Sequence, residues 1–176
     1  MAQLREVTAP AYLEGLREWP IERVRAYRDE VAEVETGLSY LRRITQGRLD
    51  IVLSEQRSRQ LGETAGDVDA LVGRLPDILG DRVHAPGRGR LPILMGPGEL
   101  DPVLSARLEA VLPSAKLDAL DEFDEAGLNA VSAALDEVER SVSSERRVVF
   151  DVIDRLQKEL VRRYRSGEAT IDSLLP

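Results

Sequence analysis

Two long stretches of this chain repeat apolar side chains at steps of three and four residues, and no proline interrupts either stretch. The first comprises Val24, Tyr27, Val31, Val34, Leu38, Leu41, Thr45 and Val52. The second comprises Leu128, Val131, Leu135, Val138, Val142, Val149, Ile153, Leu156 and Leu160. This spacing lines up side chains along one face of an α-helix. We therefore predict two long helices, each with an apolar seam.

Residues that favour helix ends bound both stretches. Pro20 suits a first helical turn, so the first helix is expected over 20–61. The second is expected from Asp121 or Asp124 to Ser166, with Gly167 as a left-handed stop. Between them, over 62–120, we expect loops and one or two short helices. The prediction is an all-α fold in which two long antiparallel helices form a coiled-coil hairpin.

The short elements of the connection are less regular. Asp101 and Pro102 predict the start of a short helix that Pro113 ends. Another short helical pattern lies within 62–80, and the prolines and glycines that follow it predict a loop.

Composition limits the class of protein. The 176 residues, 43% of them hydrophobic, are expected to form one domain, 1–176. The absence of cysteine excludes disulfides and thiolate chemistry. We find no signal pattern and no apolar run of the ~20 residues that a bilayer requires, so we expect a soluble, cytoplasmic protein that binds no membrane. A net charge of −8 argues against direct nucleic-acid binding and favours a basic protein partner.

A polar ladder accompanies each seam. The first ladder is Glu35, Ser39, Arg42, Gln46 and Asp50, at steps of four, three, four and four residues. The second ladder is Glu139, Ser143, Arg146, Phe150 and Asp154, with the same spacing and four of the five residue types. At about 100° per residue, each ladder falls in a stripe about 80° wide beside the seam. Antiparallel helices would bring both stripes to one broad face with approximate twofold symmetry.

The residue types of the ladders match the edges of guanine. Arginine presents a planar fork to guanine O6 and N7, and a carboxylate accepts from N1–H and N2–H. Serine, glutamine and the additional Arg43 and Arg147 suit ribose and phosphate. A repeated motif therefore fits a ligand that has two guanines and two phosphates.

The first ladder reads E-x3-S-x2-R-x3-Q-x3-D within ETGLSYLRRITQGRLDIV, and this resembles the RsiG family of actinobacteria. The C-terminal DRLQKELVRRYRSGEATIDSLL is similar as well. The resemblance implies an anti-sigma factor that holds a WhiG-type sigma factor and binds cyclic di-GMP, as an intercalated dimer, between its two helices. It further implies that Arg42, Arg146, Asp50 and Asp154 contact guanine. Glu35 and Glu139 would orient the arginines, and Ser39, Ser143 and Gln46 would add polar contacts.

Several alternatives stay open. The ladders are also compatible with a solvated helix face, and Phe150, in place of a second glutamine, either stacks on a base, marks weakened binding or packs in the core. A second hypothesis is a coiled-coil adaptor or anti-sigma protein that has lost the nucleotide. We expect no enzyme and no metal site. His84 is interpreted as a loop residue, the GRGR run at 87–90 does not fit the dinucleotide fingerprint, and Trp19 is expected in the core or against a partner.

Overall fold

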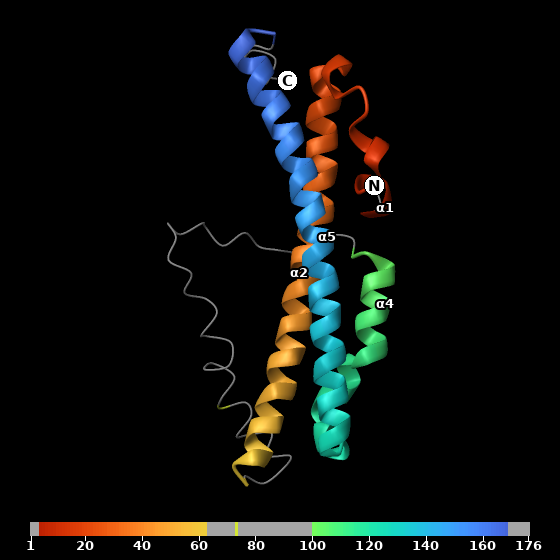
Figure 1. Ribbon diagram of the computed structural model, residues 1–176, viewed down its shortest axis with the longest axis vertical. Coiled ribbons are helices and arrows are strands. Elements are labelled where there is room, and N and C mark those ends of the chain that lie inside the picture. Colours follow the sequence, from red (N-terminus) through yellow and green to blue (C-terminus); the bar gives the residue numbers. More distant parts are fainter. Residues whose placement is uncertain (1–3, 63–72, 74–99, 169–176) are drawn as a thin grey trace. The chain divides into compact units, whose positions relative to one another are not determined.

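The computed structural model describes residues 4–62, 73 and 100–168, and these residues are largely helical (Figure 1). The two long helices are α2, Ile21–Gln60, and α5, Glu125–Ser166. Their bounds lie within a few residues of the predicted ends, and the part of the chain that is described contains no strand. The prediction of an all-α fold with two long, mutually packed antiparallel helices is confirmed.

The chain forms two compact units, and each unit contains part of both long helices. The terminal unit contains residues 4–39, 100–101 and 143–168 of the described chain, so it pairs the beginning of α2 with the end of α5. The central unit contains residues 40–62, 73 and 102–142, and pairs the end of α2 with the beginning of α5. This reversed pairing makes the helices antiparallel in both units. The expectation of a single domain over 1–176 stays a prediction.

The predicted seams form the core of each unit. In the terminal unit Val24, Val31 and Val149 are completely buried, as is Leu156. The central unit buries the following seam residues equally well: Leu41, Thr45, Val52, Leu128, Leu135, Val138 and Val142. Burying a Val or Leu side chain contributes about 1.5–3 kcal/mol relative to leaving it exposed. The seams therefore supply the main stabilisation of the helix pair in each unit.

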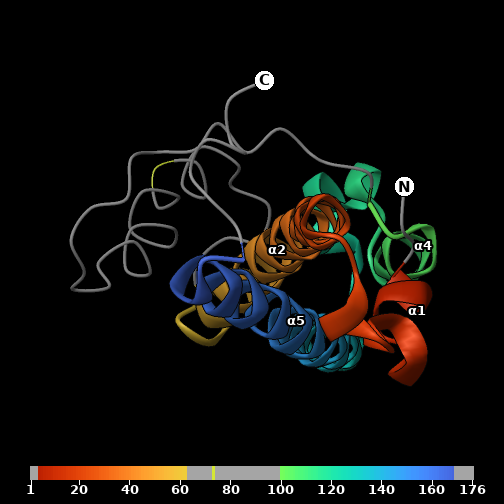
Figure 2. The same ribbon diagram turned by 90° about the horizontal axis from the view of Figure 1, so that it is seen from above.

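A segment of short helices precedes α2 and packs within the terminal unit (Figure 2). It comprises α1, Leu4–Val7, and two 3-10 helices, Pro10–Leu13 and Leu16–Glu18. Trp19 at its end is 8% exposed and contacts Tyr27 of α2 edge to face, with 4.7 Å between ring centroids. Trp19 is thus part of the core, as one of the two sequence interpretations has it. The short helices were not predicted.

The connection in the central unit is helical from residue 102 onward. Helix α4 spans Pro102–Val111, as predicted, and buries Leu104 and Leu108 (Figure 1). A 3-10 helix, Ser114–Glu122, follows where Pro113 ends α4. The backbone N–H of Gly127 then donates to Asp124 Oδ1 at 2.7 Å, which caps the start of α5.

The end of α5 also matches the sequence prediction. Gly167 follows the helix with φ of 75°, the left-handed conformation that glycine adopts without strain. Two sequence predictions lie outside the described residues, apart from residues 62 and 73. They are the short helix within 62–80 and the loop that holds His84 and the GRGR run. Within the described ranges, no helix is long and apolar enough to cross a membrane.

Candidate functional site

The central unit joins the two ladders at the Arg42 cluster, which consists of Arg42, Gln46 and Glu139. Arg42 Nε donates to Glu139 Oε1 at 2.9 Å. Gln46 Nε2 donates to the same oxygen, also at 2.9 Å. Arginine and glutamine come from α2 and lie one helical turn apart, whereas the glutamate comes from α5. One carboxylate oxygen of the second ladder therefore holds two side chains of the first.

The terminal unit joins the ladders in the opposite sense at the Arg146 cluster, which consists of Glu35, Ser39, Arg146 and Phe150. Arg146 Nε donates to Glu35 Oε1 at 2.8 Å and to Ser39 Oγ at 2.7 Å. The Ser39 hydroxyl donates in turn to Glu35 Oε1 at 2.6 Å. Here the arginine comes from α5 and the glutamate from α2. The guanidinium of Arg146 also lies 4.6 Å from the centroid of the Phe150 ring.

The two clusters repeat one contact with the helices exchanged. In each, the arginine of one ladder donates from Nε to the glutamate of the other ladder. Both contacts follow from the antiparallel direction, because residue numbers that rise along α2 fall along α5 beside it. The ladders thus meet across the helix pair within each unit, and a solvated face of independent side chains does not describe them.

The clusters leave the terminal edges of both guanidinium groups available. The side chains of Arg42 and Arg146 are 38% and 30% exposed, whereas both glutamates are 18% exposed. Within the described part of the chain, the hydrogen bonds of these two arginines run from Nε alone. Each glutamate therefore fixes the plane of a guanidinium whose two terminal nitrogens remain as donors. Such an oriented fork can address two acceptors on one edge of a planar ligand.

The remaining ladder residues take different positions. Asp154 is exposed, and Asp50 and Ser143 are half-buried with contacts of their own. The clusters described above do not include these three. Phe150 is 40% exposed, so the interpretation that it packs in the core is wrong. Arg43 and Arg147, considered for phosphate, are both exposed.

The sequence did not predict a second group of arginines. These arginines donate hydrogen bonds to backbone carbonyl oxygens and not to ladder residues. In the central unit Arg48 is 6% exposed and contacts Leu112 O, Glu109 and Ser114 Oγ, the last at 2.7 Å. Arg48 lies three residues after Thr45 and therefore at a seam position. A charged residue at such a position could have indicated this contact from the sequence. Arg48 thereby attaches the end of α4 to α2.

Arg163 has the equivalent function in the terminal unit. It donates to the carbonyl oxygens of Leu16 and Trp19, and it pairs with Glu159 at 2.7 Å. Hydrogen bonds from Arg162 and then Arg163 lower the pKa of Glu159 to about 2, against burial, which raises it. This ionised glutamate keeps Arg163 directed at the segment that precedes α2.

Acidic clusters that could bind a metal ion are absent from the ranges 4–62 and 100–168, and the carboxylates near the start of α5 include the cap Asp124. No curated protein matches the chain. A family model described as RsiG-like matches residues 10–79, which include the two 3-10 helices before α2, the whole of α2 and the first ladder. The match covers less than half of the chain and does not reach α5 or the second ladder, so over these residues the chain is similar to the RsiG-like family.

Proposed function

We propose that this chain is an anti-sigma factor that binds cyclic di-GMP at its two ladders and in that state sequesters a WhiG-type sigma factor, which represses the genes under that factor. The similarity of residues 10–79 to the RsiG-like family suggests the anti-sigma role, and this role is regulatory rather than catalytic. The nucleotide and the type of sigma factor are the finer parts of the proposal.

The observation that carries the nucleotide proposal is the reciprocal pairing of Arg42 with Glu139 and of Arg146 with Glu35. A glutamate that holds Nε aligns the terminal nitrogens of each arginine as a fork. Guanine offers two acceptors, O6 and N7, on one edge, and this pattern suits an arginine fork better than the edge of any other base. Each unit has one such arginine–glutamate pair, and cyclic di-GMP carries two guanines.

The charges around the clusters agree with a phosphate-bearing ligand. Arg43 and Arg147 are exposed next to the two ladder arginines in the sequence, although the chain as a whole carries a charge of −8. Local positive charge offsets a phosphodiester, and net negative charge disfavours nonspecific binding to nucleic acid. A small anionic nucleotide therefore fits better than a DNA or RNA strand.

The proposed mechanism is a coupling of two affinities. If cyclic di-GMP strengthens sigma-factor binding by some factor, the sigma factor must strengthen cyclic di-GMP binding by the same factor. Calorimetric titration of the nucleotide with and without a purified WhiG-type sigma factor measures both sides. Arg42→Ala and Arg146→Ala are expected to weaken nucleotide binding at least tenfold, the loss of one good bidentate base contact.

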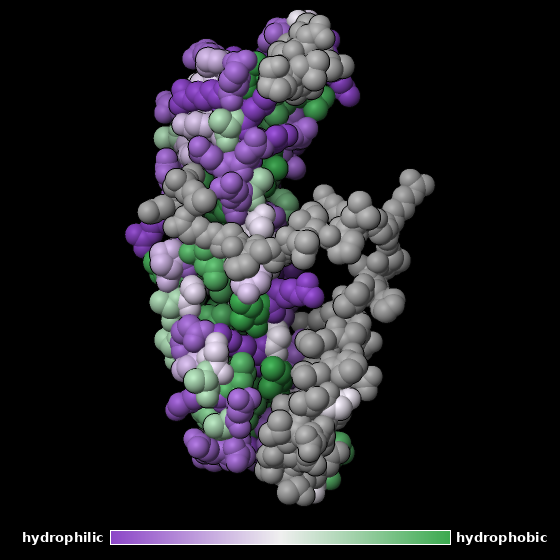
Figure 3. Space-filling view, turned by 180° about the vertical axis from the view of Figure 1, so that it is seen from behind, coloured by the Kyte–Doolittle hydropathy of each residue, from purple (hydrophilic) through white to green (hydrophobic). Residues whose placement is uncertain are grey.

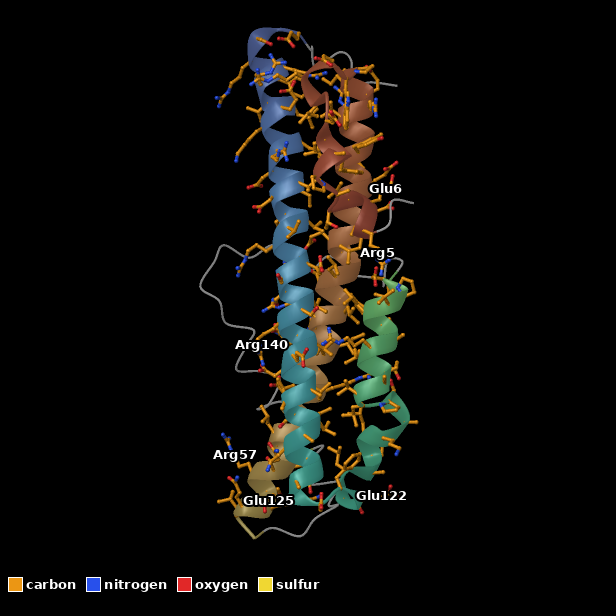
Figure 4. All side chains as sticks on the ribbon, turned by 45° about the vertical axis from the view of Figure 1, so that its right-hand side comes forward. Arg5, Glu6, Arg57, Glu122, Glu125 and Arg140 are labelled. Atoms are coloured by element: carbon orange, nitrogen blue, oxygen red, sulfur yellow. The ribbon has the colours of Figure 1, made fainter. Side chains whose placement is uncertain are left out.

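Arg140→Ala is the matched control. Arg140 lies on the same helix, is 68% exposed and pairs with Asp136 one turn away, and Figure 4 shows it on the outer side of α5. The control should bind nucleotide and sigma factor as the unaltered chain does. Binding of the sigma factor that is independent of nucleotide would instead support the coiled-coil adaptor or nucleotide-independent anti-sigma protein. Phe150, which breaks the second motif, is the observation that favours that second candidate.

A further inference from the structure

The two ladders differ in residue type at one position. In the Arg42 cluster, Gln46 donates to the glutamate oxygen that also receives Arg42 Nε. The corresponding residue of the second ladder is Phe150, whose phenyl ring has no donor. The Arg146 cluster must therefore hold its arginine without the amide that accompanies Arg42.

The Phe150 ring contacts the guanidinium of Arg146 instead. The Cζ atom of Arg146 lies 4.6 Å from the ring centroid, within the range of a cation–π contact. Phe150 remains 40% exposed, so burial of the ring does not by itself explain its position. On the face that Figure 3 shows, hydrophobic residues lie among hydrophilic ones.

The contacts of Arg146 act from two directions. Glu35 and Ser39 accept from Nε at 2.8 and 2.7 Å, which fixes one edge of the guanidinium. The ring of Phe150 lies against the same guanidinium, with its centroid 4.6 Å from Cζ. Together these contacts restrict rotation of the guanidinium and leave its terminal nitrogens as donors within the described part of the chain.

We propose that Phe150 is the positioning residue of the Arg146 cluster, where it holds the guanidinium toward guanine by a cation–π contact. This inference rests on the proposed function. Phe150 then neither marks a lost site nor serves as a base-stacking platform. Its aromatic ring, and not its volume, sets how firmly Arg146 is held.

The first experiment needs no nucleotide. The Nε–H signal of Arg146 is recorded by ¹⁵N NMR in the unaltered full-length chain and in Phe150→Trp and Phe150→Leu, with assignment by Arg146→Lys. An aromatic ring near the guanidinium shifts that signal through its ring current, so a displaced signal is expected with Phe or Trp but not with Leu. The Arg140 signal should stay constant. An Arg146 signal at one position in all three chains would overturn the proposal.

The second experiment measures cyclic di-GMP affinity by calorimetry in the same three chains, with circular dichroism to verify that each is folded. Because Trp is the best partner of a cation and Leu has no π face, affinity should follow Trp ≥ Phe > Leu. The step from Phe to Leu should weaken binding by about two- to fivefold, the factor that corresponds to an exposed cation–π contact.

The outcomes separate the two proposals. Equal affinities in all three chains, with tight binding to each, would overturn the role of Phe150 and leave the proposed function intact. Stronger binding by Phe150→Leu would overturn it as well. Failure of the unaltered chain to bind cyclic di-GMP would overturn the proposed function and the guanine-directed role, while the NMR comparison would still decide whether Phe150 holds Arg146.

Discussion

Arg42 and Leu41 are adjacent in α2, but Arg42 lies in the ladder and Leu41 in the seam. Truncation to alanine should therefore reduce stability more at Leu41 and nucleotide affinity more at Arg42. Arg42 is 38% exposed and pairs with Glu139, which keeps the hydrogen bond from Gln46 when Arg42 is removed. A partly exposed ion pair contributes at most about 1 kcal/mol to stability. Leu41 is 1% exposed, and truncation of such a leucine to alanine costs about 2–5 kcal/mol.

Urea denaturation followed by circular dichroism measures both effects. With an m-value of about 2 kcal/mol/M, Arg42→Ala should lower the midpoint by at most about 0.5 M, and Leu41→Ala by about 1–2.5 M. Nucleotide titration of the same samples should show the reverse ranking, with Arg42→Ala the more severe loss. Equal destabilisation by the two variants, or a loss of helicity in Arg42→Ala, would refute the assignment of Arg42 to a stripe beside the seam.

Three further predictions concern stability. Arg48→Ala should lower the free energy of unfolding in urea by about 2–3 kcal/mol, because the Leu112 carbonyl loses its donor and a buried side chain is removed. Arg107, an exposed arginine of α4, is the control, and Arg107→Ala should cost less than about 0.5 kcal/mol. Similar costs for the two variants would argue against the role of Arg48. The fold lowers the pKa of Glu159 from 4.5 to about 2, so its contribution to the free energy of unfolding is present above pH 4.5 and is lost as the pH falls towards 2. The difference in free energy of unfolding between the unaltered chain and Glu159→Gln should therefore narrow over that window. A constant difference would contradict the ion pair. Gly47→Ala should raise the free energy of unfolding by about 0.5–1 kcal/mol, because a Cβ there meets nothing within 4 Å; thermal denaturation that shows a decrease would contradict this.

The long helices were predictable because their signals are local and repeated. Each of these signals depends only on neighbouring residues of one helix. This holds for the seam spacing, for the cap at Asp124 and for the stop at Gly167. The ladders were also visible as stripes, and antiparallel pairing places Arg42 beside Glu139 and Arg146 beside Glu35. Antiparallel pairing therefore also explains why these contacts come in reciprocal form.

Other features depend on tertiary contacts that no local pattern encodes. The short helices before α2 have no apolar period, and Arg163 reaches them across 144 and 147 positions of sequence. Arg48 occupies a seam position in the sequence, but its acceptors become apparent only when α4 ends beside it. The Phe150 ring could not be assigned from sequence because stacking on a base, packing in the core and contact with an arginine require the same residue type.

The proposed function requires that Arg42 and Arg146, each paired with a glutamate, recognise guanine. Calorimetric titration of the unaltered chain, with the WhiG-type sigma factor present, should compare cyclic di-GMP with cyclic di-AMP. Adenine places a donor where guanine has O6, so each arginine fork would lose one of its two acceptors. We expect cyclic di-GMP to bind at least tenfold tighter than cyclic di-AMP. Equal affinity for both, or binding of neither, would contradict it.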